Sequence, residues 1–396
     1  MTDSAIHDID RIPTPETIRS LFLIDPDLAF LNHGSFGACP SPVFEEYQRW
    51  QCEFERSPVE YHMRRRDELL RTARADLGAH VNAAADDLVF VTNATVGVAI
   101  VARSLDLGPG DRVLTTDHEY GACDRMWEFL RRKRGFTIDR VEIPVPVTSH
   151  DEVVELMSGA MTERTRLLFM SHISSPTALT FPIAEICRRA RERKIISLID
   201  GAHAIGQIDL DIEAVGADFY TSNLHKWLCA PKGSAFLYAR RALHALLEPL
   251  VVSWGWEPEG ATDSMLIDHH EYQGTRELAS FLSTGAAIAF QEMWRWDEVR
   301  RRCHGLVDES RQVLRERFGF IPLSPDSPDW YTQMSAFLLP ADCDGATLQR
   351  RLFDEHQVEI PVMEWNGRQT IRVSVQGYNT EEDLARLYGG IAAVLG

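Results

Sequence analysis

The chain has 396 residues, of which 44% are hydrophobic and 25% charged, proportions typical of an ordinary globular protein. Its 41 basic and 59 acidic side chains give a net charge of −18, which argues against a surface for nucleic acid or anionic membrane. Seven scattered cysteines without a Cys-x-x-Cys pair predict neither a disulfide framework nor a metal site. Met1–Pro15 has no apolar core, and no apolar stretch approaches the length of a membrane span, so a cytoplasmic protein is expected.

The first part of the chain is predicted to be an arm followed by helices. Residues 1–28 contain one short expected helix over Pro15–Leu23. Phe30–Gly37 is a short apolar run that breaks into glycines, which predicts a tight loop. Amphipathic patterns predict helices over Ser41–Phe54 and Met63–His80.

From residue 88 onward, short apolar runs alternate with amphipathic ones. The seven predicted strands are Leu88–Thr92, Arg112–Thr116, Thr137–Ile143, Arg166–His172, Ile195–Asp200, Asp218–Tyr220 and Gly233–Tyr238. The helices predicted among them are Thr95–Leu105, Ala122–Arg134, Glu152–Met161 and Ile183–Arg193. This alternation predicts an α/β fold with a mostly parallel sheet covered on both faces. Ligands bind beyond the carboxyl ends of such strands, where Thr92, Asp117, His172 and Asp200 fall.

The last hundred residues predict a smaller α/β unit. Its expected elements are a helix over Glu298–Arg317, a strand over Met334–Leu339, a helix over Asp344–Glu355, a strand over Gln369–Val375 and a helix over Glu381–Leu395. Trp254–Arg276 is predicted as a long loop with a functional or interface role. We expect three parts: residues 1–40 as an arm that joins the small domain, 41–293 as the large domain and 294–396 as the small domain.

Lys226 is the residue around which a cofactor site can be built. It follows a predicted strand, and Asp200 ends the apolar run Lys194–Asp200 twenty-six residues earlier. Pyridoxal phosphate needs these two groups, an amine that forms a Schiff base and a carboxylate that keeps the pyridine nitrogen protonated. His203 would lie near the ring. The alternatives are a surface lysine, a helix-capping aspartate and a structural histidine. The sequence therefore predicts pyridoxal 5′-phosphate as the cofactor and Lys226 as the base for the substrate α-proton.

The cofactor phosphate needs hydrogen-bond donors, which are predicted where the helix after residue 92 begins. The backbone N–H of Ala94 and the hydroxyl of Thr95 would face an anion there, although a plain helix cap would use the same residues. Asn223 and His225, just before Lys226, are further phosphate candidates.

The remaining site candidates come from separate parts of the chain. Tyr120 can stack on the pyridine face, with His118 as the alternative. Arg372 lies inside an apolar strand, and its fork suits a substrate α-carboxylate, unless an internal salt bridge uses it. The Gly274-Thr275 segment could offer donors to a partner subunit. The substrate pocket is predicted to include Asn32 and His33 in the Asn32–Phe36 loop, and also Trp254, Trp256 and Arg64, although the aromatic residues could equally form a dimer interface.

Together these residues resemble the class V aminotransferase superfamily of fold-type I PLP-dependent enzymes, and within it the isopenicillin N epimerase-like branch. The resemblance rests on Leu31–Gly37, Thr92–Thr95, Glu119-Tyr120, Asp200–Ala204, His225–Leu228 with Ala230-Pro231, Gly274–Arg276, and Arg372 with Tyr378–Glu382. It implies a large domain with a seven-stranded sheet and a smaller C-terminal domain. It implies Lys226 as the Schiff-base lysine, Asp200 on the pyridine nitrogen, His203 near the ring, Tyr120 as the stacking aromatic, and Thr95 and His225 at the phosphate.

The resemblance also implies a homodimer and a substrate contact. Thr275 would reach the phosphate of the partner subunit, and Arg372 would bind the substrate carboxylate. Relatives often carry serine where Asn223 stands. Cysteine desulfurases are similar too, but they need a nucleophilic cysteine shortly before the arginine. Cys343, the last cysteine, is twenty-nine residues before Arg372, so a persulfide mechanism is not expected.

Several reactions share the removal of the α-proton by Lys226. The leading interpretation is a carbon–sulfur β-lyase that converts an S-substituted cysteine into a thiol, pyruvate and ammonia. It is favoured by the single clear base and by His172–Thr177, which resembles lyase-like members of the branch. An amino-acid epimerase is the alternative and would need a second proton donor, either Tyr120 or a histidine of Asp268–His270. A transaminase, an oxidative deaminase and an inactive binding module of the same fold are the remaining hypotheses.

Overall fold

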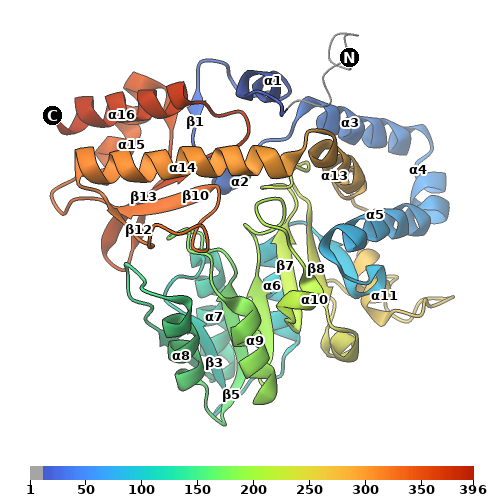
Figure 1. The fold of residues 1–396 in the computed structure, drawn as a ribbon. Helices are drawn as coiled ribbons and strands as arrows, with labels where there is room; N and C mark the ends of the chain where they lie inside the picture. The colour runs from blue at the N-terminus through green and yellow to red at the C-terminus, as the bar shows by residue number, and fades with distance from the viewer. Residues whose placement is uncertain (1–11) are drawn as a thin grey trace.

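The computed structural model describes residues 12–396, so the start of the expected arm and most of the segment searched for a signal peptide lie outside the described residues. A seven-stranded sheet in the order β2-β8-β7-β6-β5-β3-β4 forms the body of the protein (Figure 1). Its strands are β2 (Leu88–Val91), β3 (Arg112–Thr116), β4 (Thr137–Val141), β5 (Thr165–Ser171), β6 (Ile196–Asp200), β7 (Phe219–Asn223) and β8 (Ala235–Ala239). Strand β8 is antiparallel to both neighbours, while the other adjacent strands run parallel. The predicted mostly parallel sheet is confirmed.

The apolar runs bury the sheet on both faces. In β5, Leu167 and Phe169 belong to one apolar cluster, whereas Leu168 and Met170 belong to another, because successive side chains of a strand point to opposite faces. Helices α6 (Ala94–Ser104) and α7 (Gly121–Arg134) pack in the first cluster. The second cluster holds α5 (Arg66–Val81), α8 (His150–Ala160), α9 (Ile183–Glu192) and α13 (Thr284–Met293). A parallel sheet covered in this way presents its carboxyl edge as the free place for a ligand.

The C-terminal part is built on a second sheet, which is antiparallel. Its order is β12-β13-β10-β9, with β9 (Ile321–Pro322), β10 (Met334–Leu338), β12 (Val362–Trp365) and β13 (Arg368–Ser374). Helices α14 (Trp296–Phe318), α15 (Gly345–His356) and α16 (Glu381–Leu395) accompany it, and in Figure 1 α14 runs across the top of the large sheet. The sequence predicted β10 and β13 but missed β9, which has only two residues, and β12, whose four residues include the exposed Glu364 and form no continuous apolar run.

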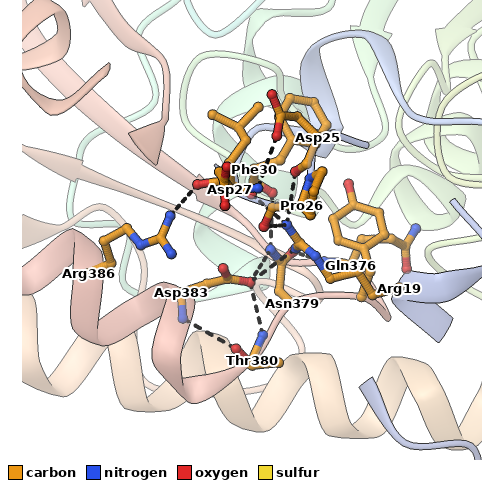
Figure 2. Close-up of polar contacts among 12 residues, drawn as sticks. Arg19, Asp25, Pro26, Asp27, Phe30, Gln376, Asn379, Thr380, Asp383 and Arg386 are labelled. Carbon is orange, nitrogen blue, oxygen red and sulfur yellow. Dashed lines mark hydrogen bonds and ion pairs between the residues drawn. The ribbon is translucent and has the colours of Figure 1, made fainter. Parts of the chain in front are cut away.

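The N-terminal segment is tied to this C-terminal part. Strand β1 (Ala29–Phe30) pairs in parallel with β11 (Val358–Glu359). Arg19 lies in α1 (Pro15–Ser20). Its guanidinium donates to the backbone carbonyls of residues 25, 26 and 28 (Figure 2). Asn379 Nδ2 donates to the Phe30 carbonyl at 3.1 Å and to Asp383 at 3.0 Å. These contacts fix the segment that follows β1. The boundaries expected at residues 40 and 293 stay predictions.

The segments between residues 41 and 87 and between 240 and 283 are more helical than predicted. The elements of these segments not yet named are α3 (Ser41–Arg56), α4 (Pro58–Glu60), the π-helix η1 (Tyr61–Arg65), η2 (Ala85–Asp87), η3 (Arg241–Leu246), α11 (Met265–Glu271) and α12 (Ala279–Leu282). Elsewhere the structure adds α10 (Ile212–Val215) and the one-turn helix α2 (His33–Phe36), where a tight loop was expected. The expected loop Trp254–Arg276 therefore contains a helix. Ser264 caps α11 through the Ile267 N–H, and burial of Leu266, Ile267 and Glu271 stabilises a helix whose two turns are too short to be recognised in the sequence.

A buried ion pair holds α11 against α5. Arg74 Nη1 donates to Glu271, and both side chains are almost inaccessible to solvent. Removing one partner of a buried pair leaves the other charge uncompensated, which costs about 3–5 kcal/mol. We expect Arg74→Met to lower the free energy of unfolding by about that amount in urea titrations. Arg71→Met is the matched control, because the Arg71–Glu68 pair is exposed, and its effect should stay within about 0.5 kcal/mol. Equal effects of the two variants on the free energy of unfolding would contradict the conclusion that the Arg74–Glu271 ion pair is buried.

Among the described residues, no helix combines the length and the apolar character needed to cross a membrane.

Candidate active site

A cavity of about 570 Å³ lies at the carboxyl edge of the large sheet, a volume within the usual range for small-molecule sites. Eight of the predicted site residues line it: Ala94, Thr95, Tyr120, Asp200, His203, Asn223, His225 and Lys226. They come together because β2, β6 and β7 end at the same edge of the sheet. Lys226 follows β7 by three residues, and the first turn of α6 follows β2.

Lys226 is held beside a neutral histidine. Its Nζ lies 3.0 Å from His203 Nε2, and the Trp227 indole N–H donates to His203 Nδ1 at 3.2 Å. Because Nδ1 accepts this bond, the His203 proton resides on Nε2 and faces the amine. Burial, with a smaller effect of the Arg372 charge, lowers the pKa of Lys226 to about 7. Much of the amine is therefore unprotonated at neutral pH and can act as a nucleophile or a base.

Asp200 is a buried carboxylate that forms no ion pair within residues 12–396. It accepts a hydrogen bond from the Ala202 N–H at 2.9 Å, and Cys123 Sγ lies 3.7 Å away. Burial raises its pKa. Glu119 lies behind it and accepts bonds from the hydroxyls of Thr116 and Ser171 at 2.6 and 2.7 Å. Burial raises the pKa of Glu119 to about 8, so Glu119 is mostly neutral at pH 7.

The start of α6 forms another wall of the cavity. Asn93 caps the helix through the Val96 N–H at 2.9 Å, and Asn223 Oδ1 accepts from the Ala94 N–H at 2.8 Å. The Ala94 N–H is thus already occupied, which differs from the expectation that it is free for an anion. Asn223 retains its Nδ2 donors. His225 Nδ1 donates to the Ser234 carbonyl at 2.8 Å, which leaves Nε2 for a ligand.

Arg372 is a fully buried cation beside the cavity. Its guanidinium donates from Nη1 to the Ser175 carbonyl at 2.7 Å and from Nη2 to the Ser35 hydroxyl at 3.2 Å. Nε has no hydrogen-bond partner, and no carboxylate of the described residues forms an ion pair with Arg372. Burial lowers its pKa to about 10, so it remains charged at neutral pH. The internal salt bridge considered as the alternative does not form among these residues.

Several predicted pocket residues lie off the cavity wall. Asn32 donates to Glu359 at 3.0 Å, and His33 is fully buried against the Lys226 carbonyl, so the structure places both behind the wall. Thr275 is exposed and lies outside the cavity. Trp254 and Trp256 line a separate depression between α5 and the loop before α11. The exposed Arg64 lines neither of these two surfaces.

Other residues of the cavity were not singled out in the sequence as site residues. They are Thr92, Asn93, Ser171, Ile173, Ser175, Ala202, Lys232 and Gly233, whereas Ser35 and Phe36, which also line the cavity, belong to the Asn32–Phe36 loop predicted to shape the pocket. Some carried a signal, because Thr92 falls at a strand end and Ser175 lies in a run compared with lyases. Ser171 was overlooked because it belongs to an apolar strand, and only its position as the last residue of β5 points to an exposed edge.

Comparison with known proteins gives the family. The profile of "Aminotransferase class-V" matches residues 42–387. An isopenicillin N epimerase from Amycolatopsis lactamdurans is 36% identical over 381 residues, which are 93% of this chain and 96% of that protein. A probable chloroplastic L-cysteine desulfhydrase from Arabidopsis thaliana is 32% identical over 93% of this chain and 83% of that protein. A solved structure of C-DES, a cystine C–S lyase with glycine covalently linked to its PLP cofactor, has 19% identity and a TM-score of 0.82 over 96% of this chain and 100% of that one.

The chain belongs to the class V aminotransferase family. It is a PLP-dependent enzyme with the fold-type I architecture, as the sequence predicted. The residues at the cavity fit this cofactor: a buried carboxylate without a protein cation, a lysine amine with a lowered pKa, and a helix N-terminus. When bound, pyridoxal phosphate supplies an electron sink for the negative charge that develops at the substrate α-carbon.

Asp200→Asn removes the charge of this carboxylate but keeps the size and shape of the side chain. Asp200 is the candidate to hold the protonated pyridine nitrogen, which a neutral amide could not do, so we expect kcat to fall by about 10²-fold or more, the size of losing one focused electrostatic contact. Steady-state kinetics, with the visible absorbance of the bound cofactor as a check on loading, would measure this. Asp124→Asn is the control, because Asp124 pairs with Arg140 on the surface. A loaded Asp200→Asn enzyme with unchanged kcat would contradict the role.

Proposed function

We propose that this enzyme is a carbon–sulfur β-lyase that acts on an S-substituted L-cysteine. The observation that carries the proposal is the Lys226 amine, which has a lowered pKa and lies 3.0 Å from the neutral His203 in the wall of the cavity. The uncompensated Arg372 beside this wall suits the α-carboxylate of an amino acid. A single base and a carboxylate anchor are what a β-elimination needs.

The residues would divide the work in the following way. Lys226 would bind the cofactor aldehyde, Asp200 would hold the proton of the pyridine nitrogen, and Tyr120 would stack on the ring. Asn223 and His225 would donate to the phosphate beside the dipole of α6, together with the Thr95 hydroxyl. A phosphate dianion at His225 Nε2 would raise the pKa of that imidazole, which burial otherwise lowers to about 4, and the charged ring would then donate from both nitrogens.

The elimination begins when Lys226 Nζ removes the α-proton of the substrate. The Cβ–S bond then breaks, and its electron pair leaves with sulfur as a thiolate, which takes up a proton. The remaining three-carbon enamine hydrolyses to pyruvate and ammonia. None of the described cysteines lines the cavity, which supports elimination over a persulfide route. Relatives named cysteine desulfhydrase and a structural neighbour named C–S lyase support the same chemistry.

An amino-acid epimerase is the second candidate, favoured by two relatives of that name that align over 93% and 96% of the chain. Epimerisation needs a second proton donor on the face opposite Lys226. Tyr120 is the candidate in the cavity. The histidines of α11 lie outside it, and His270 is buried.

The experiment is a coupled assay of pyruvate and free thiol with a panel of S-substituted L-cysteines, with chiral chromatography of the remaining amino acid. Pyruvate and thiol in equal amounts would support the lyase. Loss of chirality without pyruvate would overturn it in favour of the epimerase. A Lys226→Ala variant run beside the wild type controls for cofactor-catalysed elimination in solution.

We also propose that the enzyme works as a homodimer in which Thr275 reaches the partner's phosphate site. The supporting observation is a group of exposed apolar side chains: Trp254 and Trp256, in the depression between α5 and the loop before α11, are 77% and 49% exposed, and Met63 in η1 is 62% exposed. Gly274 adopts a φ of 100°, which sets the exposed Thr275 on a turn. Light scattering should give twice the mass of the chain, and Trp254→Asp should shift the mass toward the monomer. A wild-type monomer at all concentrations would overturn the proposal.

A further inference from the structure

We propose that His33 is a positioning residue that sets the lysine of the active site through the Lys226 backbone. The inference rests on the proposed role of Lys226. His33 lies in α2, in the N-terminal segment, 193 positions before the lysine. Its imidazole is fully buried and does not line the cavity, so it acts without touching substrate.

The hydrogen bonds fix the tautomer of His33. Its Nε2 lies 3.0 Å from the Lys226 carbonyl, and its Nδ1 lies 2.9 Å from the Tyr378 hydroxyl. A carbonyl can only accept, so Nε2 must carry the proton and Nδ1 must accept from Tyr378. Gln376 Nε2 lies 3.2 Å from His33 Nε2, but because both atoms then carry protons it forms no hydrogen bond there and instead donates to Cys229 Sγ at 3.7 Å. Burial lowers the pKa of His33 to about 3, so the ring stays neutral and is no proton donor to the reaction.

The backbone that His33 holds is strained. The Lys226 carbonyl also accepts from the Cys229 N–H at 3.1 Å, which closes a turn directly after the lysine. Cys229 adopts a φ of 63° in this turn, a conformation that L-residues other than glycine rarely adopt. Such strain persists where surrounding contacts over-determine it. The His33 bond is one of these contacts, and it fixes the direction in which the lysine side chain leaves the backbone.

The same segment also contacts the proposed carboxylate anchor. The Ser35 hydroxyl bonds to Arg372, and an added Cβ on Gly34 would stand 3.3 Å from the guanidinium. An added Cβ on Gly37 would lie 2.2 Å from the His225 carbonyl. Residues 33–37 therefore touch the backbone of the base on one side and the guanidinium on the other. We infer that this segment sets the distance between the amine and the bound carboxylate.

The test compares three variants of the holoenzyme. His33→Leu removes both bonds at similar volume, His33→Gln keeps a side-chain N–H that can reach the carbonyl, and Tyr378→Phe removes only the bond to Nδ1. We expect His33→Leu to lower kcat by about 10²-fold with little change in KM, the effect of misplacing a reacting group by about 1 Å. His33→Gln should recover activity to within about tenfold of wild type, and Tyr378→Phe should lower kcat measurably, by up to about tenfold, with a shift in the cofactor titration.

A second readout does not depend on turnover. The pH midpoint of the visible absorbance of the bound cofactor, and the rate at which the cofactor dissociates, both report the position of the lysine. Both should shift in His33→Leu and return toward wild type in His33→Gln. His304→Leu is the control, because His304, on α14, donates to the Thr332 carbonyl and lies outside the cavity. Near-ultraviolet circular dichroism tests whether each variant is folded.

The outcomes separate this inference from the function on which it rests. If His33→Leu keeps the wild-type kcat and cofactor titration, the positioning role is overturned and the role of Lys226 stands. If His33→Leu does not fold, the two milder variants decide: a normal cofactor titration in Tyr378→Phe together with unimpaired kcat overturns the inference. If Lys226→Ala retains activity, the proposed role of Lys226 is overturned, and the positioning role of His33 is overturned with it.

Discussion

Lys226→Ala is expected to lower kcat by at least about 10³-fold, because it removes the base for the α-proton and the amine that bonds to the cofactor. The visible absorbance that pyridoxal phosphate acquires on bonding to lysine should disappear, while the fold is retained. Lys133→Ala, on the exposed face of α7, is the matched control and should behave as wild type. Turnover that survives in Lys226→Ala would show that another group removes the proton.

The lowered pKa of Lys226 gives this prediction a pH dependence. A pKa lowered to about 7 means that the neutral amine predominates above pH 7 and is progressively lost below it. Reconstitution of the cofactor-free protein with pyridoxal phosphate should therefore slow by about tenfold per pH unit well below pH 7. A lysine at its ordinary pKa would instead show this slope throughout the neutral range. Stopped-flow absorbance at fixed cofactor concentration would distinguish the two.

Arg372→Met is expected to lower kcat/KM by about 10²- to 10³-fold, mostly through KM, because truncation of a buried charged partner costs about 2–5 kcal/mol of binding. Arg372→Met is not expected to lower the stability of the fold. Arg372 is buried without a protein carboxylate, and replacing an uncompensated buried cation by an apolar side chain is neutral or stabilising. The variant should therefore melt no lower than wild type while it loses substrate.

Two controls sharpen the Arg372 experiment. Arg372→Lys keeps the charge but not the two-pronged geometry, so it should recover only part of the affinity. The Arg372 charge also lowers the pKa of Lys226, so in Arg372→Met the midpoint of reconstitution should move to higher pH, whereas in Arg372→Lys it should move less. An unchanged KM for the amino acid in Arg372→Met would contradict the role of carboxylate anchor.

The large sheet and much of the cofactor site could be predicted because their signals are local. Strands such as β6 are short apolar runs. Asp200 is the last residue of β6, and Lys226 follows the end of β7 by three residues. The covering helices begin and end at recognisable caps such as Asn93. Strand β9 has two residues and β12 is interrupted by the exposed Glu364, so neither forms an apolar run, and the seven residues of α11 are too few to show a helical period.

The surroundings of His33, Arg372 and Glu119 could not be predicted from the sequence, because they depend on contacts between segments that are distant in the chain. His33 was expected to bind substrate, because its motif resembles the family and a sequence does not show which way a buried ring points. Its partners are Lys226 and Tyr378, 193 and 345 positions away. The absence of an ion-pair partner for Arg372 among the described residues, and the position of Glu119 behind Asp200, likewise depend on the packing of β13 and on the turn after β3.

The most direct test of the account is exchange of the substrate α-hydrogen in D₂O, followed by proton NMR, with wild type, Lys226→Ala and Lys133→Ala. The account predicts that wild type and Lys133→Ala convert an S-substituted L-cysteine into thiol and pyruvate, with deuterium entering from solvent, and that Lys226→Ala does neither. Deuterium at the α-carbon with loss of chirality and without pyruvate would contradict the lyase. Exchange that persists in Lys226→Ala would contradict the central role of the lysine.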